Sequence, residues 1–173
     1  MSDIATRLAR SRVPLGFVFG LVVILLARPT PRSVLIGVDI ALVGEMFRMW
    51  AAGHLEKGRE VTRSGPYRLT RHPLYMGSAI IGVGVAVAAA RLSVAVMVLA
   101  YLGVTIVAAI RHEEAGMRAR FGEQYDAYLQ SRAQPVDRTF SFERAVRNKE
   151  YRAIAGLAVM TAILAIKAAL GSK

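Results

Sequence analysis

The stretch that decides the fold is LYMGSAIIGVGVAVAAARLSVAVMVLAYLGVTIVAAI, residues 74–110, in which Arg91 separates two apolar runs. Each run, Leu74–Ala90 and Leu92–Ile110, is about as long as the 17 or so residues that cross a bilayer. Because so little chain separates them, the runs predict two antiparallel helices in a tight hairpin. The flanking segments, 54–73 and 111–150, then emerge on the same side and can form one site.

Three further apolar segments, at about 13–27, 33–53 and 151–170, predict additional helices. The first follows basic residues as a signal peptide would, but RPTPR takes the place of a small-residue cleavage site, so we expect a retained helix. The second contains Asp39, to which we assign no role, and other charged residues, so it cannot face lipid on all sides. The fold class expected is therefore all-α: one domain, residues 1–173, forming a polytopic integral membrane protein with about five transmembrane helices.

The charge distribution favours a membrane over nucleic acid. The 173 residues are 54% hydrophobic with a formal net charge of +11, and the basic residues stand beside apolar blocks rather than along one polar face. Most Lys and Arg residues lie before the first helix, in 54–73 and in 111–150, which the positive-inside rule assigns, with the N-terminus, to the cytoplasm. The absence of cysteine excludes disulfides, thiolate nucleophiles and cysteine metal sites.

The loop before the hairpin, SGPYRLTRHPLYMG at 64–77, is rich in residues with special properties. Its prolines stiffen the backbone, and Pro73 suits the first turn of a helix, whose free N–H groups favour an anionic ligand group. Tyr67 and Tyr75 offer ring faces to a cation or a flat ring, and Gly77 allows a close approach to the first turn. A membrane-interface loop with aromatic anchors is the alternative.

The segment after the hairpin, RHEEAGMRARFGEQYDAYLQS at 111–131, holds two adjacent carboxylates. Glu113 and Glu114 suit hydrogen bonds to ribose hydroxyls or to an ammonium group, or they are salt-bridge partners of nearby arginines. A metal site that includes His112 is not expected, because adjacent helical residues point about 100° apart and no HExxH spacing exists.

Aromatic residues in the same segment form a predicted stripe. Phe121, Tyr125 and Tyr128 stand at i, i+4 and i+7, so on a single helix they share one face. We expect that face to pack on the membrane surface or on the opposite loop.

Charged residues within the second apolar segment are a further candidate site. Glu45 and Arg48 are one helical turn apart and form either a buried ion pair or part of an acceptor cavity and its proton path. His54 and Lys57 follow that segment and are expected at the interface, with a smaller chance of contact with the ligand.

The two motifs together, GPYRLTRHPLYMG and, after the hairpin, EEAGMRARFGEQYDAYL, resemble the isoprenylcysteine carboxyl methyltransferase family and its phospholipid methyltransferase relatives. The resemblance covers about residues 50–132 and implies an integral membrane enzyme that uses S-adenosylmethionine. It implies that the cofactor is lined by Tyr67, His72, Pro73, Tyr75 and Glu113, supported by Arg71, Gly77 and Glu114. Arg59–Thr62 corresponds to another cofactor-lining strip.

The chain departs from the prenylcysteine enzymes where they bind substrate. Their arginine four residues before the first glutamate is replaced by Ala109, their RVP motif is replaced by SRAQPVDR, and the helix at about 151–170 lies outside the shared core. The resemblance implies a lipid-like acceptor with an isoprenylcysteine-type carboxylate or a phospholipid-type amine, and a thiol or an alkene stays open. We expect contact with membrane lipids, no nucleic acid and no obligate protein partner. The catalytic candidates are Arg111, Glu45 and Arg48.

Two other classes of function remain open. Sterol reductases have a similar membrane core and an R-H-P loop but use NADPH, and their later segment resembles this chain less. A small proton-coupled transporter that uses Glu45 is the non-enzymatic alternative, although it gives no role to 111–150.

Overall fold

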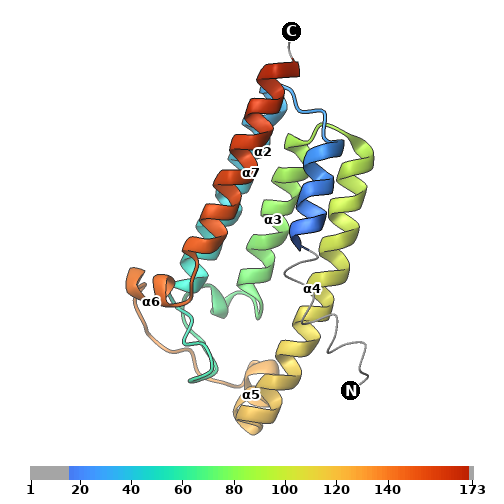
Figure 1. Cartoon of the computed structure of the whole chain (residues 1–173). Helices are drawn as coiled ribbons and strands as arrows, with labels where there is room; N and C mark the ends of the chain where they lie inside the picture. Colours follow the sequence, from blue (N-terminus) through green and yellow to red (C-terminus); the bar gives the residue numbers. More distant parts are fainter. Residues whose placement is uncertain (1–15, 172–173) are drawn as a thin grey trace.

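The computed structural model describes residues 16–171, and all of their regular structure is helical. The helices are Gly16–Leu26, α2 (Pro31–Ala52), the 3-10 turn η1 (Gly65–Arg68), α3 (Pro73–Ala88), α4 (Leu92–Phe121), α5 (Glu123–Leu129), α6 (Phe142–Arg147) and α7 (Tyr151–Gly171). The long helices run side by side, and η1, α5 and α6 gather at one end of the bundle (Figure 1). The all-α prediction is confirmed for these residues.

Five membrane spans are not confirmed by helix length and composition. Among the described residues, α4 and α7 are long and apolar enough to cross a membrane. The helix Gly16–Leu26 and α3 are shorter, and α2 carries Asp39, Glu45 and Arg48 along its length. The first residues of the predicted run 13–27, residues 13–15, lie outside the described part of the chain.

The helical hairpin forms as predicted, but its second helix is longer than the apolar run. Helices α3 and α4 are antiparallel, joined by a turn in which Ala90 has a φ of 48° (Figure 1). Helix α4 continues to Phe121 and ends at Gly122, whose φ of 45° is outside the helical region. The predicted single aromatic stripe is therefore wrong, because Phe121 ends α4 whereas Tyr125 and Tyr128 lie on α5.

Helices α2 and α3 pack with their backbones in contact. A Cβ atom added at Gly84 would lie 2.5 Å from the carbonyl oxygen of Gly37 and 2.7 Å from the nitrogen of Ala41. One added at Gly44 would lie 2.7 Å from the carbonyl oxygen of Gly77. Small residues that permit such an approach are typical of helix contacts in membranes, where packing rather than water exclusion holds helices together.

Because of this contact, the effect of one added methyl group on stability should depend strongly on where it is added. Gly84→Ala should destabilise the protein by about 1–3 kcal/mol, because two helix backbones must separate to make room. Gly103→Ala is the matched control, since nothing lies within 4 Å of a Cβ there and alanine favours the helix. Thermal unfolding in detergent should show a loss of several degrees for the first variant and none for the second. Equal midpoints would contradict the packing described.

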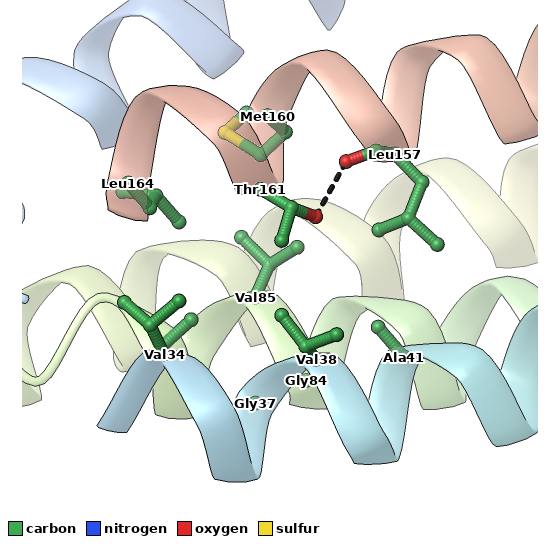
Figure 2. Close-up of a pocket in the computed structure, with 11 residues that line it drawn as sticks. Val34, Gly37, Val38, Ala41, Gly84, Val85, Leu157, Met160, Thr161 and Leu164 are labelled. Atoms are coloured by element: carbon green, nitrogen blue, oxygen red, sulfur yellow. Dashed lines mark hydrogen bonds between the residues drawn. The ribbon is translucent and has the colours of Figure 1, made fainter. Parts of the chain in front are cut away.

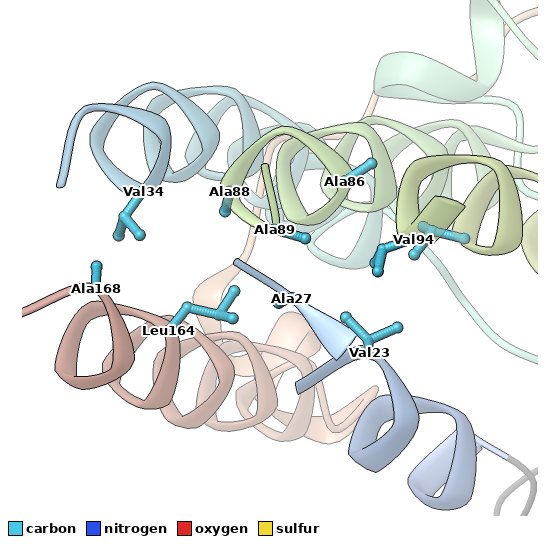
Figure 3. Packing of buried hydrophobic residues seen from close by; sticks show 10 residues of the cluster. Val23, Ala27, Val34, Ala86, Ala88, Ala89, Val94, Leu164 and Ala168 are labelled. Carbon is cyan, nitrogen blue, oxygen red and sulfur yellow. The ribbon is translucent and has the colours of Figure 1, made fainter. Parts of the chain in front are cut away.

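A core of small apolar side chains fills the end of the bundle away from η1 and α5 (Figure 3). Val23, Val94 and Leu164 are fully buried there. At the same end the Lys167 ammonium donates to the carbonyl oxygens of Ile24 and Leu25, at 2.7 and 3.0 Å, which places a cation at the C-terminus of the helix Gly16–Leu26. Helix α7 thus contributes to the core and caps a neighbouring helix.

The crevice between α2, α3 and α7 is a packing seam. Figure 2 shows its apolar side chains and Thr161, whose hydroxyl donates to the carbonyl oxygen of Leu157 at 2.6 Å. Its volume is about 10 Å³, roughly the space of one water molecule, so it is too small for a ligand.

Candidate active site

A cavity of about 490 Å³ opens at the end of the bundle where η1 and α5 lie. Small-molecule sites range over roughly 300–1,000 Å³, so this volume suits a cofactor-sized ligand. Seven of the predicted site residues line it: Arg48, Tyr67, Arg71, His72, Pro73, Tyr75 and Glu113. The two motifs, on either side of the hairpin in the sequence, therefore contribute to one cavity.

Four predicted residues do not line the cavity: Glu45, Gly77, Arg111 and Glu114. Arg111 is exposed on α4. The close approach that Gly77 permits is that of α2, since a Cβ there would lie 2.5 Å from Cγ of Arg48 and 2.8 Å from the carbonyl oxygen of Gly44. Helix packing therefore accounts for Gly77 without a ligand.

The segment 64–72, which precedes α3 and which we call the loop wall, is docked on α5 by hydrogen bonds. The Tyr128 hydroxyl donates to the carbonyl oxygen of Tyr67 at 2.9 Å, and the Arg71 guanidinium donates to that of Leu129 at 2.6 Å. Tyr67 is buried between these contacts. One member of the predicted stripe, Tyr128, thus packs on the opposite loop, as expected.

The two adjacent glutamates have different surroundings. Nε2 of His72 lies 3.1 Å from Oε1 of Glu114, which joins the residue before α3 to α4. Glu113 lines the cavity and has no ion pair or hydrogen bond through its carboxylate among residues 16–171. Neighbouring helical residues point about 100° apart, so Glu114 pairs with His72 whereas Glu113 is available to a ligand in the cavity.

Arg48 links α2 to two distant segments. Its Nε donates to Oε1 of Glu150 at 2.6 Å, and its Nη1 donates to the carbonyl oxygen of Leu74 at 3.3 Å and to the Ser78 hydroxyl. Oε2 of Glu45 is 3.9 Å from Nε of Arg48, and neither carboxylate oxygen of Glu45 has a hydrogen-bond partner among the described residues. The predicted Glu45–Arg48 pair is therefore secondary to a bond with Glu150, which lies 102 residues from Arg48.

Sequence reasoning missed part of the cavity wall. Of the strip Arg59–Thr62, all but Arg59 line the cavity, and Lys57 lines it whereas His54 does not. The unpredicted lining residues include Leu55, Glu56, Met117 and Arg120. Met117 and Arg120 stand at i+4 and i+7 from Glu113 on α4, a helical spacing that could have identified them. Leu55 and Glu56 carry no such signal, because their position depends on how the loop at 53–63 folds.

Residues 33–124, more than half of the chain, match the phospholipid methyltransferase family. The chain belongs to this family. No curated protein and no solved structure matches the chain. The matched region covers nearly all of α2, the loop wall, α3 and α4, but not the segment 132–150 or α7. Membership in a family of methyltransferases that act on lipids agrees with two membrane-capable helices and supports membrane association.

Three tyrosines that line this methyltransferase's cavity, Tyr67, Tyr125 and Tyr128, are neutral at physiological pH. Burial raises the pKa of Tyr67 and of Tyr128 above the ordinary value of 10. Burial, with the nearby Glu114 and Glu113 carboxylates, raises the pKa of Tyr125 to about 12. The phenols therefore act as hydrogen-bond donors and ring surfaces and do not serve as bases.

The methyltransferase should lose stability as the pH falls below 6.5, because of His54. Its buried ring has Nδ1 3.1 Å from the Ser64 hydroxyl oxygen, and burial, then repulsion by Arg144, Arg138 and Arg68, lowers its pKa below 6.5. Between its folded pKa and 6.5 the unfolded chain takes up a proton that the folded chain refuses, so stability falls as the pH falls.

Thermal unfolding from pH 8 to pH 5 measures this effect. The His54→Gln variant should lose most of the pH dependence in that window, whereas His112→Gln, at an exposed position, should retain it. The pKa of Glu56 is lowered from 4.5, mainly by a hydrogen bond from Arg144, so its effect falls in a separate window below pH 4.5. Identical pH profiles for wild type and His54→Gln would contradict the assignment.

Proposed function

We propose that this methyltransferase uses S-adenosylmethionine to methylate a lipid-like acceptor held in the membrane. One observation carries the proposal: a single cavity of cofactor size brings the loop residues Tyr67–Tyr75 together with the unpaired Glu113. Family membership supports methyl transfer to lipids, and the cavity provides groups that suit the proposed cofactor.

The lining groups match the chemistry of S-adenosylmethionine, which supplies an activated methyl group on a sulfonium. The Glu113 carboxylate suits the ammonium group or the ribose hydroxyls, and the N-terminus of α3 at Pro73 suits the carboxylate. The rings of Tyr67 and Tyr75 suit the flat base or the cation. We do not place Glu113 at the sulfonium, because a carboxylate there would stabilise the charged ground state more than the transition state.

The chain's contribution to catalysis in this proposal is positioning and exclusion of water. A methyl donor that is already activated needs its carbon held in line with the acceptor atom, and orientation of this kind supplies much of the rate enhancement in comparable reactions. The buried Tyr67 and the docked loop wall provide a fixed surface for this purpose.

The acceptor, a carboxylate or an amine on a membrane-partitioned molecule, is proposed to enter sideways from the bilayer. In this arrangement the helix Gly16–Leu26, α2, α3, α4 and α7 span the membrane, with the N-terminus and the cavity on the cytoplasmic side. Arg48 lines the cavity and Glu45 lies beside it, so these two residues, rather than the exposed Arg111, are the candidates to meet the acceptor.

The first test is calorimetric titration of S-adenosylhomocysteine into the detergent-solubilised protein. Micromolar binding is expected. In a separate assay, S-adenosylmethionine labelled in its methyl group should transfer that group to lipids that carry a carboxylate or an amine. Failure of a well-folded protein to bind would contradict the proposal. Binding of NADPH instead would favour a reductase. If the protein bound neither ligand, a transport function would be favoured.

A further inference from the structure

A segment outside the family match packs against the loop at 53–63, which forms part of the cavity wall. We call residues 132–150 the strap; it leaves α5, passes along the loop at 53–63 and joins α7 (Figure 1). Its backbone pairs with both ends of that loop, since the Val136 N–H donates to the carbonyl oxygen of Arg63 at 3.3 Å and the Ser141 N–H to that of Gly53 at 3.1 Å. The strap and the loop therefore lie side by side.

Strap side chains bind two acidic residues of the loop at 53–63. Nη1 of Arg138 lies 2.7 Å from Oε1 of Glu60, and Nε of Arg144 lies 2.8 Å from Oε1 of Glu56. Arg147 adds a second cation to Glu56 at 3.3 Å. Glu56 and Glu60 line the cavity, whereas none of the strap residues does.

Backbone contacts strengthen the attachment of the strap. The Asn148 amide donates to the carbonyl oxygens of Ala52 and Leu55 at 2.9 and 2.8 Å, and Arg138 also donates to that of His54 at 3.3 Å. These bonds satisfy carbonyl groups at and after the C-terminus of α2, where a helix leaves acceptors without internal partners. The loop is thereby fixed at its start and along its acidic side chains.

We propose that Arg138 is a positioning residue for the cofactor site. It keeps Glu60 paired, so that among the described residues Glu113 remains the one unpaired carboxylate that lines the cavity. The inference rests on the proposed function. Without Arg138, Glu60 becomes a second unpaired carboxylate on the cavity, and the loop at 53–63 loses an anchor near its middle. Arg144 has the same relation to Glu56, but Arg147 shares that carboxylate and buffers its loss.

Titration of S-adenosylhomocysteine into variants of the full chain tests this role. Arg138→Gln should weaken binding about tenfold, equivalent to about 1.4 kcal/mol, and Arg138→Lys should recover most of it. Adding Glu60→Gln to Arg138→Gln should recover part of the affinity, because the carboxylate that Arg138 no longer pairs is then neutral. Arg132→Gln is the matched control, since the Arg132 side chain bonds Gln130 at the end of α5 and not the loop at 53–63.

Hydrogen exchange of the ligand-free protein provides the second readout. Arg138→Gln should speed exchange at residues 53–63 while α2 remains protected. Wild-type affinity in Arg138→Gln, a loss that does not depend on Glu60, or unchanged exchange at 53–63 would each overturn the inference. Wild-type protein that binds no S-adenosylhomocysteine would overturn the proposed function, and the exchange result would still decide whether the strap holds the wall.

Discussion

Glu113→Ala should weaken binding of S-adenosylhomocysteine about a hundredfold. The carboxylate lines the cavity and has no partner among the described residues, so its hydrogen-bonding capacity is available to a ligand. Hydrogen bonds to a charged group contribute about 1.5–3 kcal/mol, a range that includes a hundredfold change in affinity. Calorimetric titration in detergent measures it directly.

Two neighbouring positions on α4 separate ligand binding from helix damage. His112→Ala removes an exposed side chain next to Glu113 and should leave affinity unchanged. Glu114→Gln alters the partner of His72 and should reduce affinity less than Glu113→Ala, because Glu114 does not line the cavity. Equal binding by wild type and Glu113→Ala would remove this residue from the site.

Arg48→Met should cause the largest loss of stability. Its guanidinium joins α2 to Glu150, to the carbonyl oxygen of Leu74 and to Ser78. Methionine retains much of the apolar stem but leaves the buried Glu150 and Glu45 without a cation. Breaking a buried ion pair from one side costs about 3–5 kcal/mol, so the melting temperature should fall by about 10 °C.

A second change shows whether the loss comes from an orphaned charge. Arg48→Met combined with Glu150→Gln should recover part of the stability, since the most closely paired carboxylate is then neutral. Arg152→Met, at an exposed position four residues before Gly156 on α7, should have little effect. Unfolding temperatures that agree for wild type and Arg48→Met would show that the pair contributes no stability.

The sequence predicted the fold where local chemistry decides it. The apolar runs around Arg91 predict the hairpin, and RPTPR predicts the break before α2, which begins at Pro31. The apolar run predicts an end near Ile110, because hydropathy falls at Arg111. Helix α4 instead continues to Phe121, since polar residues such as Glu and Arg also favour helix formation. A polar helical extension is not visible in a pattern that measures apolar length.

The candidate site was predictable in its motifs but not in its long-range partners. Glu113 and the loop residues follow from type and spacing, and the structure places them in one cavity, although their contact with a cofactor stays a prediction. Glu150 and Arg138 are 102 and 78 residues from their partners Arg48 and Glu60, respectively. Such pairs depend on how the chain returns after α5, for which charge alone in a strongly basic sequence gives no signal.

The backbone contact between α2 and α3 restricts how the proposed lipid-like substrate can reach the cavity. An acyl chain that slid between these helices would have to separate Gly44 from Gly77 and Gly37 from Gly84, where there are no side chains to rotate aside. The two helices are therefore expected to move as one rigid unit, which keeps Arg48 on α2 at a fixed distance from His72 at the start of α3. If the acceptor enters sideways as proposed, its path should therefore run along α4 or α7 and not between α2 and α3.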